Sequence, residues 1–258
     1  MANDKRQLGS VETKVENQIA YITFYHPSHN SLPGRLLADL TASIDTAGQN
    51  DEVKVVVLQS AGDRTFCAGA SFDELISIKD FESGKQFFLG FANVINAIRK
   101  CPKFVIGRVQ GKAVGGGVGL CGAVDYCVAT KWASVKLSEL AIGIGPFVVG
   151  PAVEKKIGSS AMTQLAINAT EWKSAQWAQQ KGLFTEVYDS IEEVDEHIQT
   201  LAQKLSNSNP EAMRLLKRVF WEACDHWDQL LDERAAMSGK LVLSDFTGAA
   251  IERFKAKA

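Results

Sequence analysis

Strand-like and helical runs alternate along the first 190 residues of this 258-residue chain, in a strand–strand–helix order that recurs about three times. Residues 53–62 contain a short continuous apolar run, which is typical of a strand buried on both faces of a parallel sheet. Further strands are predicted as follows: a hairpin over residues 11–27 with its turn at Asn17, a strand over 103–111, and two short strands within 126–138. This alternation predicts an α/β fold.

Helical periodicity accounts for the intervals between these strands. Apolar residues at helical spacing predict a helix over 31–47, with Ser31 as its N-cap, and another over 81–100. Only helices are expected beyond about residue 190, and Pro210 is placed in the first turn of a helix over 210–242.

Composition and charge exclude several classes of function. The net charge of −2 gives no electrostatic reason to expect nucleic acid or a membrane as the main partner. The five cysteines lack CxxC spacing, and no His, Cys or Asp cluster has the spacing of a metal site, so we predict no metal. The N-terminus lacks the apolar segment of a signal peptide and no run reaches transmembrane length, which predicts a cytoplasmic protein.

The stretch GKAVGGGVGLCGAVD, residues 111–125, holds six glycines and leads into a helical pattern. Three glycines before a helix present unpaired N–H groups at the positive end of the helix dipole, which suits a phosphate or a developing oxyanion. The stretch has neither the G-x-G-x-x-G spacing of a dinucleotide site nor the Gly-Lys-Ser/Thr of a P-loop. Close helix packing is an equally good explanation of these glycines when the stretch is taken alone.

A second candidate for backbone donors lies in FCAGASFDEL, residues 66–75. Gly69 lies between two alanines after a buried strand, and Asp73 and Glu74 begin a helix. The small alanines would leave room for a ligand beside the backbone, although by itself this stretch predicts only a turn.

Four stretches taken together, HPSHNSL, FCAGASFDEL, GKAVGGGVGL and LSELAIGIGP, resemble in order and interval the enoyl-CoA hydratase/isomerase family, the crotonases. The resemblance extends from about residue 11 to the end of the chain. It implies a spiral of ββα units over residues 1–190, which holds the acyl-CoA site, and a C-terminal helical trimerisation region over 191–258. It also implies homotrimers or hexamers, an acyl-CoA thioester as ligand, and no cofactor beyond the coenzyme A of that substrate.

The resemblance assigns roles to particular residues. The thioester oxygen is expected between the backbone N–H groups of Ala70 and Gly116, where two preorganised donors would stabilise an enolate. The acid/base residue is Glu139. Further substrate-binding residues are expected at Ala68, Phe72, Gly115, Gly119, Phe147 and Val148, with Phe254 and Lys257 closing the pocket from a C-terminal helix of this chain or of a neighbouring subunit. A solvated basic terminus is the alternative for the last two.

The chain departs from the family's hydratases at the first of their two glutamates, which is replaced by Gly119. Phe147, Val148 and Val149 stand where the family has a turn of small residues, so we expect a dry site in which burial raises the pKa of Glu139. A single carboxylate favours double-bond isomerisation. The alternatives are a hydratase or lyase, for example on a branched acyl-CoA such as methylglutaconyl-CoA, a decarboxylase, or a non-catalytic acyl-CoA-binding subunit.

The remaining polar and apolar signals point to structure rather than chemistry. Asp125 resembles the family's structural aspartate, and His197 and His226 are expected to pack among the C-terminal helices. An apolar stripe at helical spacing predicts either core packing or, with the family resemblance, a subunit interface; it comprises Met213, Leu216, Phe220, Ala223, Trp227 and Leu230.

Overall fold

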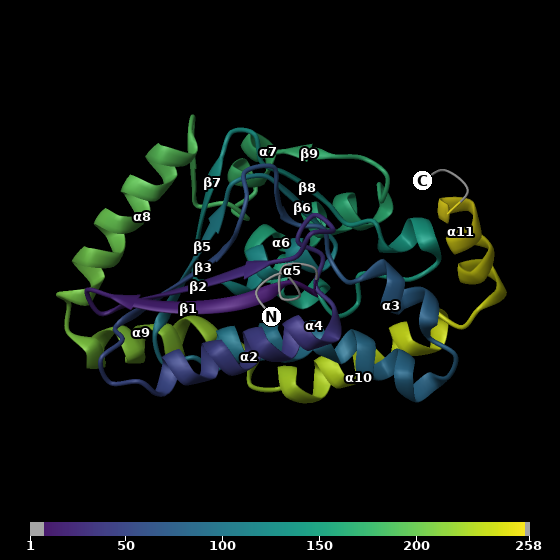
Figure 1. Cartoon of the computed structure of the whole chain (residues 1–258), viewed down its shortest axis with the longest axis horizontal. Helices are drawn as coiled ribbons and strands as arrows, with labels where there is room; N and C mark the ends of the chain where they lie inside the picture. Colours follow the sequence, from purple (N-terminus) through teal and green to yellow (C-terminus); the bar gives the residue numbers. More distant parts are fainter. Residues whose placement is uncertain (1–7, 256–258) are drawn as a thin grey trace.

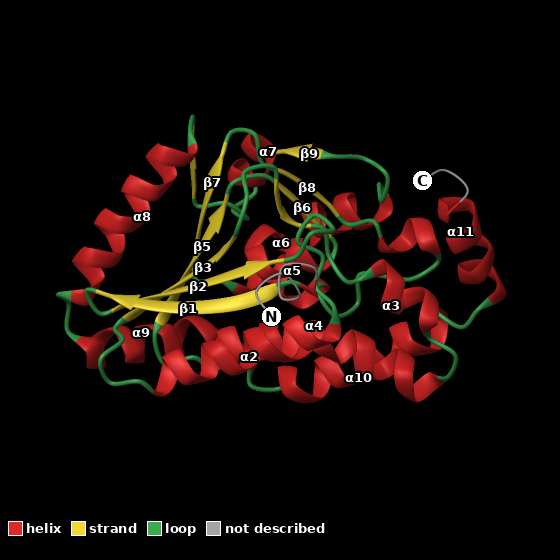
Figure 2. Ribbon diagram, viewed as in Figure 1, coloured by secondary structure: helices red, strands yellow, loops and turns green. Residues whose placement is uncertain are grey.

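The structure is a computed structural model that describes residues 8–255, with only the backbone of the last two (Figure 1). Two sheets are enclosed by helices, as the colouring by secondary structure shows (Figure 2). No helix in the described part of the chain is long and apolar enough to cross a lipid bilayer. All five cysteines are buried and free.

The larger sheet has six strands in the order β1-β2-β3-β5-β7-β10. Their bounds are Ser10–Glu16, Ile19–Tyr25, Val55–Ser60, Phe104–Val109, Tyr126–Thr130 and Glu186–Tyr188. β1 and β2 form an antiparallel hairpin, and every other pairing in this sheet is parallel. Asn17 and Gln18 both have positive φ in the hairpin turn, as a two-residue turn between twisted strands requires. The predicted turn at Asn17 is therefore confirmed.

The smaller sheet has the order β4-β6-β8-β9, with bounds Thr65–Cys67, Lys112–Val114, Ser134–Lys136 and Lys173–Ser174. The chain gives a strand to the larger sheet and then one to the smaller sheet three times in succession, as β3 and β4, β5 and β6, and β7 and β8. The predicted strand–strand–helix recurrence is confirmed. Two details were wrong: β4 lies in a stretch interpreted as a turn, and β6 is a separate strand after β5.

The helices of the first part of the chain are α2 (Gly34–Gln49), α3 (Phe72–Ser77), α4 (Phe81–Lys100), α5 (Gly116–Ala123), the 3₁₀ helix η1 (Glu139–Ile142), α6 (Gly150–Ile167) and α7 (Ala175–Gln180). Ser31 is not the N-cap of α2, because Leu32 pairs with Ala70 and keeps the chain extended as far as Pro33. The first N–H of α2, at Gly34, instead donates to Glu74 Oε2 at 2.8 Å. Glu74 thus caps a helix forty residues upstream in the sequence.

From Ile191 to Lys255 the structure contains only helices: α8 (Ile191–Ser206), α9 (Pro210–Trp221), η2 (Glu222–Cys224), α10 (Trp227–Leu241) and α11 (Asp245–Lys255). Pro210 begins α9 as predicted, with the Asn209 side chain as N-cap. The single helix predicted over 210–242 was wrong, because the chain breaks at η2. α8 covers one face of the larger sheet, and α10 runs along α4 on the opposite side of the molecule (Figure 1).

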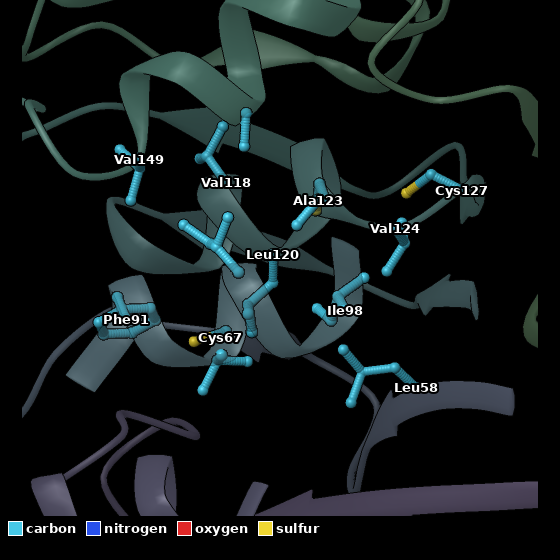
Figure 3. Close-up of a cluster of buried hydrophobic side chains, with 14 of the residues drawn as sticks. Leu58, Cys67, Phe91, Ile98, Val118, Leu120, Ala123, Val124, Cys127 and Val149 are labelled. Atoms are coloured by element: carbon cyan, nitrogen blue, oxygen red, sulfur yellow. The ribbon is translucent and has the colours of Figure 1, made fainter. Parts of the chain in front are cut away.

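The main core surrounds α5, whose eight residues are all buried. Figure 3 shows apolar side chains converging on this helix from α4 (Phe91, Ile98), β3 (Leu58) and β7 (Cys127). The glycine-rich stretch thus lies at the centre of the molecule, and the start of α5 is held rigidly.

A buried ion pair fixes α9 to this core. Lys217 Nζ lies 2.8 Å from Asp125 Oδ2, with the two side chains 3% and 7% exposed. Asp125 Oδ1 also accepts a hydrogen bond from Trp221 Nε1 at 2.8 Å, and Oδ2 accepts one from the Val105 N–H. Asp125, which follows α5, therefore has the structural role predicted for it.

The predicted apolar stripe on the C-terminal helices is divided between two faces. Met213 and Trp227 are buried, whereas Leu216 and Phe220 are 47% and 51% exposed. The inward face of α9 includes the charged Lys217, and its outward face carries Leu216, Val219 and Phe220. The outward face is apolar and uncovered in the single chain, so the use of this region for trimerisation stays a prediction.

Candidate active site

A cavity of about 200 Å³ lies between the start of α5, the loop after β4, α4 and the segment that follows β8. Its lining is mostly apolar. The lining residues are Ala68, Gly69, Ala70, Phe72, Leu75, Phe87, Phe88, Phe91, Val114, Gly115, Gly116, Ser138, Glu139, Ile142, Ile144, Gly145, Pro146, Phe147, Val148, Val149 and Ser238.

Gly115 shapes the entry of the chain into α5. Its backbone has φ 52° and ψ −114°, a conformation that side-chain-bearing residues rarely adopt. A methyl group there would also lie 3.0 Å from Glu139 Oε1. Glycine at this position therefore allows both the turn and the close approach of the Glu139 carboxyl group.

Two residues that line the cavity have backbone N–H groups without a partner in the described part of the chain. Gly69, with φ 91°, turns the chain after β4, and its carbonyl accepts a hydrogen bond from the Leu32 N–H at 2.8 Å. Within the described residues, neither the Ala70 N–H nor the Gly116 N–H donates to any acceptor. The two loops are close together, since a methyl group on Gly69 would lie 3.6 Å from the Gly116 nitrogen. Gly116 is buried and Ala70 is half-buried. Because N–H groups shielded from solvent are rarely left unpaired, this pair is a candidate anion-binding site.

Glu139 begins η1 and directs its carboxyl group into the cavity wall. Its Oε2 atom is buried and has no hydrogen-bond partner among the described residues. Burial raises the pKa of Glu139 to about 7, and its own backbone N–H offsets this only in part. Glu139 is the one titratable side chain in the described lining, and its carboxyl group can accept or release a proton near neutral pH.

The rest of the wall is aromatic and aliphatic. Five phenylalanines line it: Phe72, Phe87, Phe88, Phe91 and Phe147. The Phe91 ring covers Gly116, where any side chain would overlap it. No lysine, arginine or histidine contributes to the described lining. The cavity is therefore suited to an uncharged, apolar group.

Gly119 does not line the cavity. A methyl group on it would lie 2.5 Å from Val149 Cγ1, and one on Gly122 would lie 2.7 Å from the Ala152 backbone. These two glycines let α5 pack directly on the start of α6. Both explanations of the glycine-rich stretch therefore hold, at different positions: the first glycines face the cavity, and the later ones permit helix packing.

Most of the predicted site residues come together. The cavity is lined by Ala68, Ala70, Phe72, Gly115, Gly116, Glu139, Phe147 and Val148, as expected. Gly119 was expected to line the substrate site, and this placement was wrong: Gly119 is not part of the lining, and Val149, which is, packs against it. Lys257 lies outside the described residues. Phe254 lies in α11, but its side chain is likewise outside the description.

The sequence did not identify the cavity residues of α4 and α10. Phe87, Phe88 and Phe91 lie on a helix whose apolar spacing was recognised, but spacing alone does not say which apolar side chain meets a cavity. Ser238 on α10 gave no signal at all.

α11 packs against η1 of the same chain, where Gly143 lies beside Phe246.

The remaining candidates have structural surroundings. His26, in the HPSHNSL stretch, shares a hydrogen bond with the Ser31 hydroxyl through Nδ1. Burial lowers the pKa of the His26 imidazole. His197 is part of α8, and its Nδ1 atom lies 2.7 Å from the Tyr188 hydroxyl. No group of three or more His, Cys, Asp or Glu residues within 8–255 could hold a metal ion.

Comparison with known proteins places this geometry in context. The family profile described as Enoyl-CoA hydratase/isomerase matches residues 14–250. A protein of Arabidopsis thaliana named peroxisomal Delta(3,5)-Delta(2,4)-dienoyl-CoA isomerase is 26% identical over 257 residues, covering 93% of this chain and 91% of its own. A protein of Bacillus subtilis (strain 168) named probable enoyl-CoA hydratase is 26% identical over 215 residues, which is 83% of each chain.

Solved structures bear on the fold. The crystal structure of an enoyl-CoA hydratase from Bacillus halodurans matches with a TM-score of 0.88 at 20% identity, covering 94% of this chain and 99% of that one. The α/β fold expected from the four motif stretches is confirmed by this likeness.

Proposed function

Because the chain belongs to the enoyl-CoA hydratase/isomerase family, we propose that it shifts a carbon–carbon double bond in an acyl-CoA thioester, with Glu139 as the single acid/base. The observation that carries this proposal is the cavity itself. It combines one buried carboxyl group, two unpaired backbone N–H groups and an apolar wall.

One carboxylate is sufficient for such a shift. Starting from a 3-enoyl-CoA, the Glu139 carboxylate removes a proton from C2. The electrons of that C–H bond form a C1=C2 bond, and the π electrons of the thioester carbonyl move onto its oxygen to give a dienolate, from which they return to the carbonyl when C4 is protonated. The neutral Glu139 carboxyl group then returns the proton to C4. The electron pair of the old C3=C4 bond makes the new C4–H bond, the C2=C3 bond forms, and the carboxylate is regenerated.

The thioester oxygen carries the negative charge of the intermediate. We assign the Ala70 and Gly116 N–H groups as its two donors, since both are unpaired and both line the cavity. Donors that are already aligned cost no reorganisation as the charge develops, and each is worth about 3 kcal/mol in comparable sites. Ala68 and Phe72 are assigned to the coenzyme A side of the site, and Phe147 and Val148 to the acyl side.

The alternative reactions have less support. Hydration is usually served by two groups that together position one water, and the described cavity has one. A carboxylated acyl chain, which decarboxylation or a methylglutaconyl substrate requires, would bury its charge without a cationic partner in the described lining. The Arabidopsis relative carries the name of an isomerase, whereas the Bacillus subtilis relative carries that of a hydratase.

Assembly and location belong to the same proposal. The uncovered apolar face of α9, formed by Leu216, Val219 and Phe220, supports association into a trimer or hexamer. Five free, buried cysteines support a reducing compartment such as the cytoplasm.

The experiment that tests the reaction compares three substrates. The protein is incubated separately with 3-enoyl-CoA, 2-enoyl-CoA and methylglutaconyl-CoA, and the products are followed by mass and ultraviolet absorbance. We expect 3-enoyl-CoA to gain the absorbance of a conjugated thioester at unchanged mass. A product heavier by one water or lighter by one CO₂, without isomerisation, would contradict the proposal.

A further inference from the structure

Position 119 lies one turn of α5 after Gly115, and Val149 packs directly on it. Gly119 follows Gly115 by four residues and donates its N–H to the Gly115 carbonyl, so the two lie on one side of α5, one turn apart. On that side, a methyl group at Gly115 would lie 3.0 Å from Glu139 Oε1. At Gly119 it would lie 2.5 Å from Val149 Cγ1 and 2.8 Å from Val149 Cβ.

Val149 is held in this position by the packing of two helices. It immediately precedes α6 and is 4% exposed, yet its side chain lines the cavity. Gly122, one turn further along α5, meets the backbone of Ala152 and Val153 so closely that no side chain would fit between the helices. α6 therefore cannot move away from α5 without leaving a void, and Val149 stays packed on Gly119. Figure 3 shows Val149 above the α5 residues Val118 and Leu120.

We propose that Val149 is a specificity-determining residue of this site. Seated on Gly119, it fills the place where a side chain from α5 would enter the cavity near Glu139. It thereby limits the cavity to one acid/base group and removes the space for a water molecule between position 119 and the Glu139 carboxyl group. This inference rests on the proposed double-bond isomerisation. By excluding water, Val149 would prevent hydration from competing with that reaction.

The physical reason is the demand of a buried water for partners. A water held in a cavity makes about two to four hydrogen bonds to polar groups. The isopropyl group of Val149 offers none. In the proposed complex the thioester oxygen occupies the Ala70 and Gly116 N–H groups, which leaves the Glu139 carboxyl group without a second acid/base group to position a water. Removing Val149 and supplying a carboxylate at position 119 would provide both the space and the second partner.

The test uses four variants, Gly119→Glu, Val149→Gly, the double variant Gly119→Glu/Val149→Gly, and its matched control Gly119→Gln/Val149→Gly. Hydration of 2-enoyl-CoA is measured for each. We expect the double variant to exceed the glutamine control by about 10²-fold, the usual contribution of one positioned acid/base group. Gly119→Glu alone should not hydrate, because its side chain has no room beside Val149.

Two results would overturn the inference. One is a double variant that is folded and gains thermal stability with 2-enoyl-CoA, yet hydrates no faster than the glutamine control. The other is Gly119→Glu alone hydrating as fast as the double variant. Isomerisation of 3-enoyl-CoA by the wild type is measured separately, so failure of the proposed function is distinguished from failure of the role of Val149.

A single substitution covers the case in which the double variant does not fold. Val149→Ser replaces the isopropyl group just before α6 with a smaller hydroxyl-bearing side chain and opens the wall to water. With 3-enoyl-CoA deuterated at C2, transfer of deuterium to C4 should fall in this variant relative to the wild type, because water then reaches the Glu139 carboxyl group. Unchanged transfer in a folded Val149→Ser protein would overturn the inference.

Discussion

Replacing Glu139 by glutamine is expected to make the protein less active and more stable at the same time. Glutamine keeps the size and hydrogen-bonding capacity of the side chain but cannot accept the proton from C2. We expect turnover of 3-enoyl-CoA to fall by about 10²- to 10⁴-fold. Affinity for the thioester should change little, because the backbone N–H groups of Ala70 and Gly116 are untouched.

The gain in stability follows from the raised pKa. Burial moves the pKa of Glu139 from 4.5 to about 7, so between these values the folded protein binds more protons than the unfolded one. Stability is therefore lost as the pH rises from the unfolded pKa to the folded one, and is constant above it. A shift of this size corresponds to about 3–4 kcal/mol at most, at about 1.4 kcal/mol per unit. Glutamine is neutral throughout and avoids this loss.

The assay measures unfolding by heat and by urea at about pH 5 and about pH 8, on either side of the folded pKa. We expect Glu139→Gln to exceed the wild type in stability at the higher pH, by several degrees in Tm, and much less at the lower pH. Glu154→Gln, at an exposed site on α6, is the matched control and should show no such pH-dependent difference. The reasoning fails if Glu139→Gln is equally or less stable at the higher pH, or if it retains wild-type turnover.

Four further outcomes are expected. In the wild type, kcat/KM for isomerisation should rise with pH and level off above about 7, since Glu139 must be charged to act as the base; a rate that falls over this range would assign the role to another group. Lys217→Met leaves Asp125 buried without its cation and should lower the free energy of unfolding by about 3–5 kcal/mol, whereas the exposed Arg218→Met should have little effect in the same denaturation experiment. Calorimetry should show tighter binding of CoA thioesters than of free CoA or the carboxylic acid, and equal affinities would argue against the Ala70 and Gly116 donors. Light scattering should show a trimer or hexamer that Val219→Glu converts to a 28.1 kDa monomer; a monomeric wild type would contradict the role given to α9.

Local chemistry allowed much of the fold to be predicted from the sequence. The turn at Asn17 and the helix start at Pro210 depend on preferences of the residues themselves. The glycine triplet before α5 was recognised because glycines at a helix start leave backbone N–H groups accessible, and the structure adds a positive φ at Gly115. Such features need no knowledge of distant parts of the chain.

What could not be predicted depends on contacts between distant segments. Glu74 caps α2 from forty residues further along the chain. Nothing in the sequence near Ser31 indicates that the Ser31 hydroxyl bonds His26 instead of capping the helix. Lys217 belongs to the inward face of α9 because Asp125 lies beneath it, although a lysine in a helical stripe ordinarily indicates the solvent side. In the candidate site, the family resemblance indicates that Gly119 replaces a carboxylate, but only the packing of α6 on α5 brings Val149 against that position.

The central claim is that one carboxyl group both removes and returns the proton, and a label-transfer experiment tests it most directly. The protein is incubated in ordinary water with 3-enoyl-CoA carrying deuterium at both C2 positions, and the product is examined by NMR after a small fraction has reacted. We predict 2-enoyl-CoA with one deuterium at C2 and a substantial fraction of the second at C4, because the Glu139 carboxyl group is buried and holds the deuteron between the two steps. Rapid conversion with only ordinary hydrogen at C4 would contradict the account, since the proton would then reach C4 from water or from a second group.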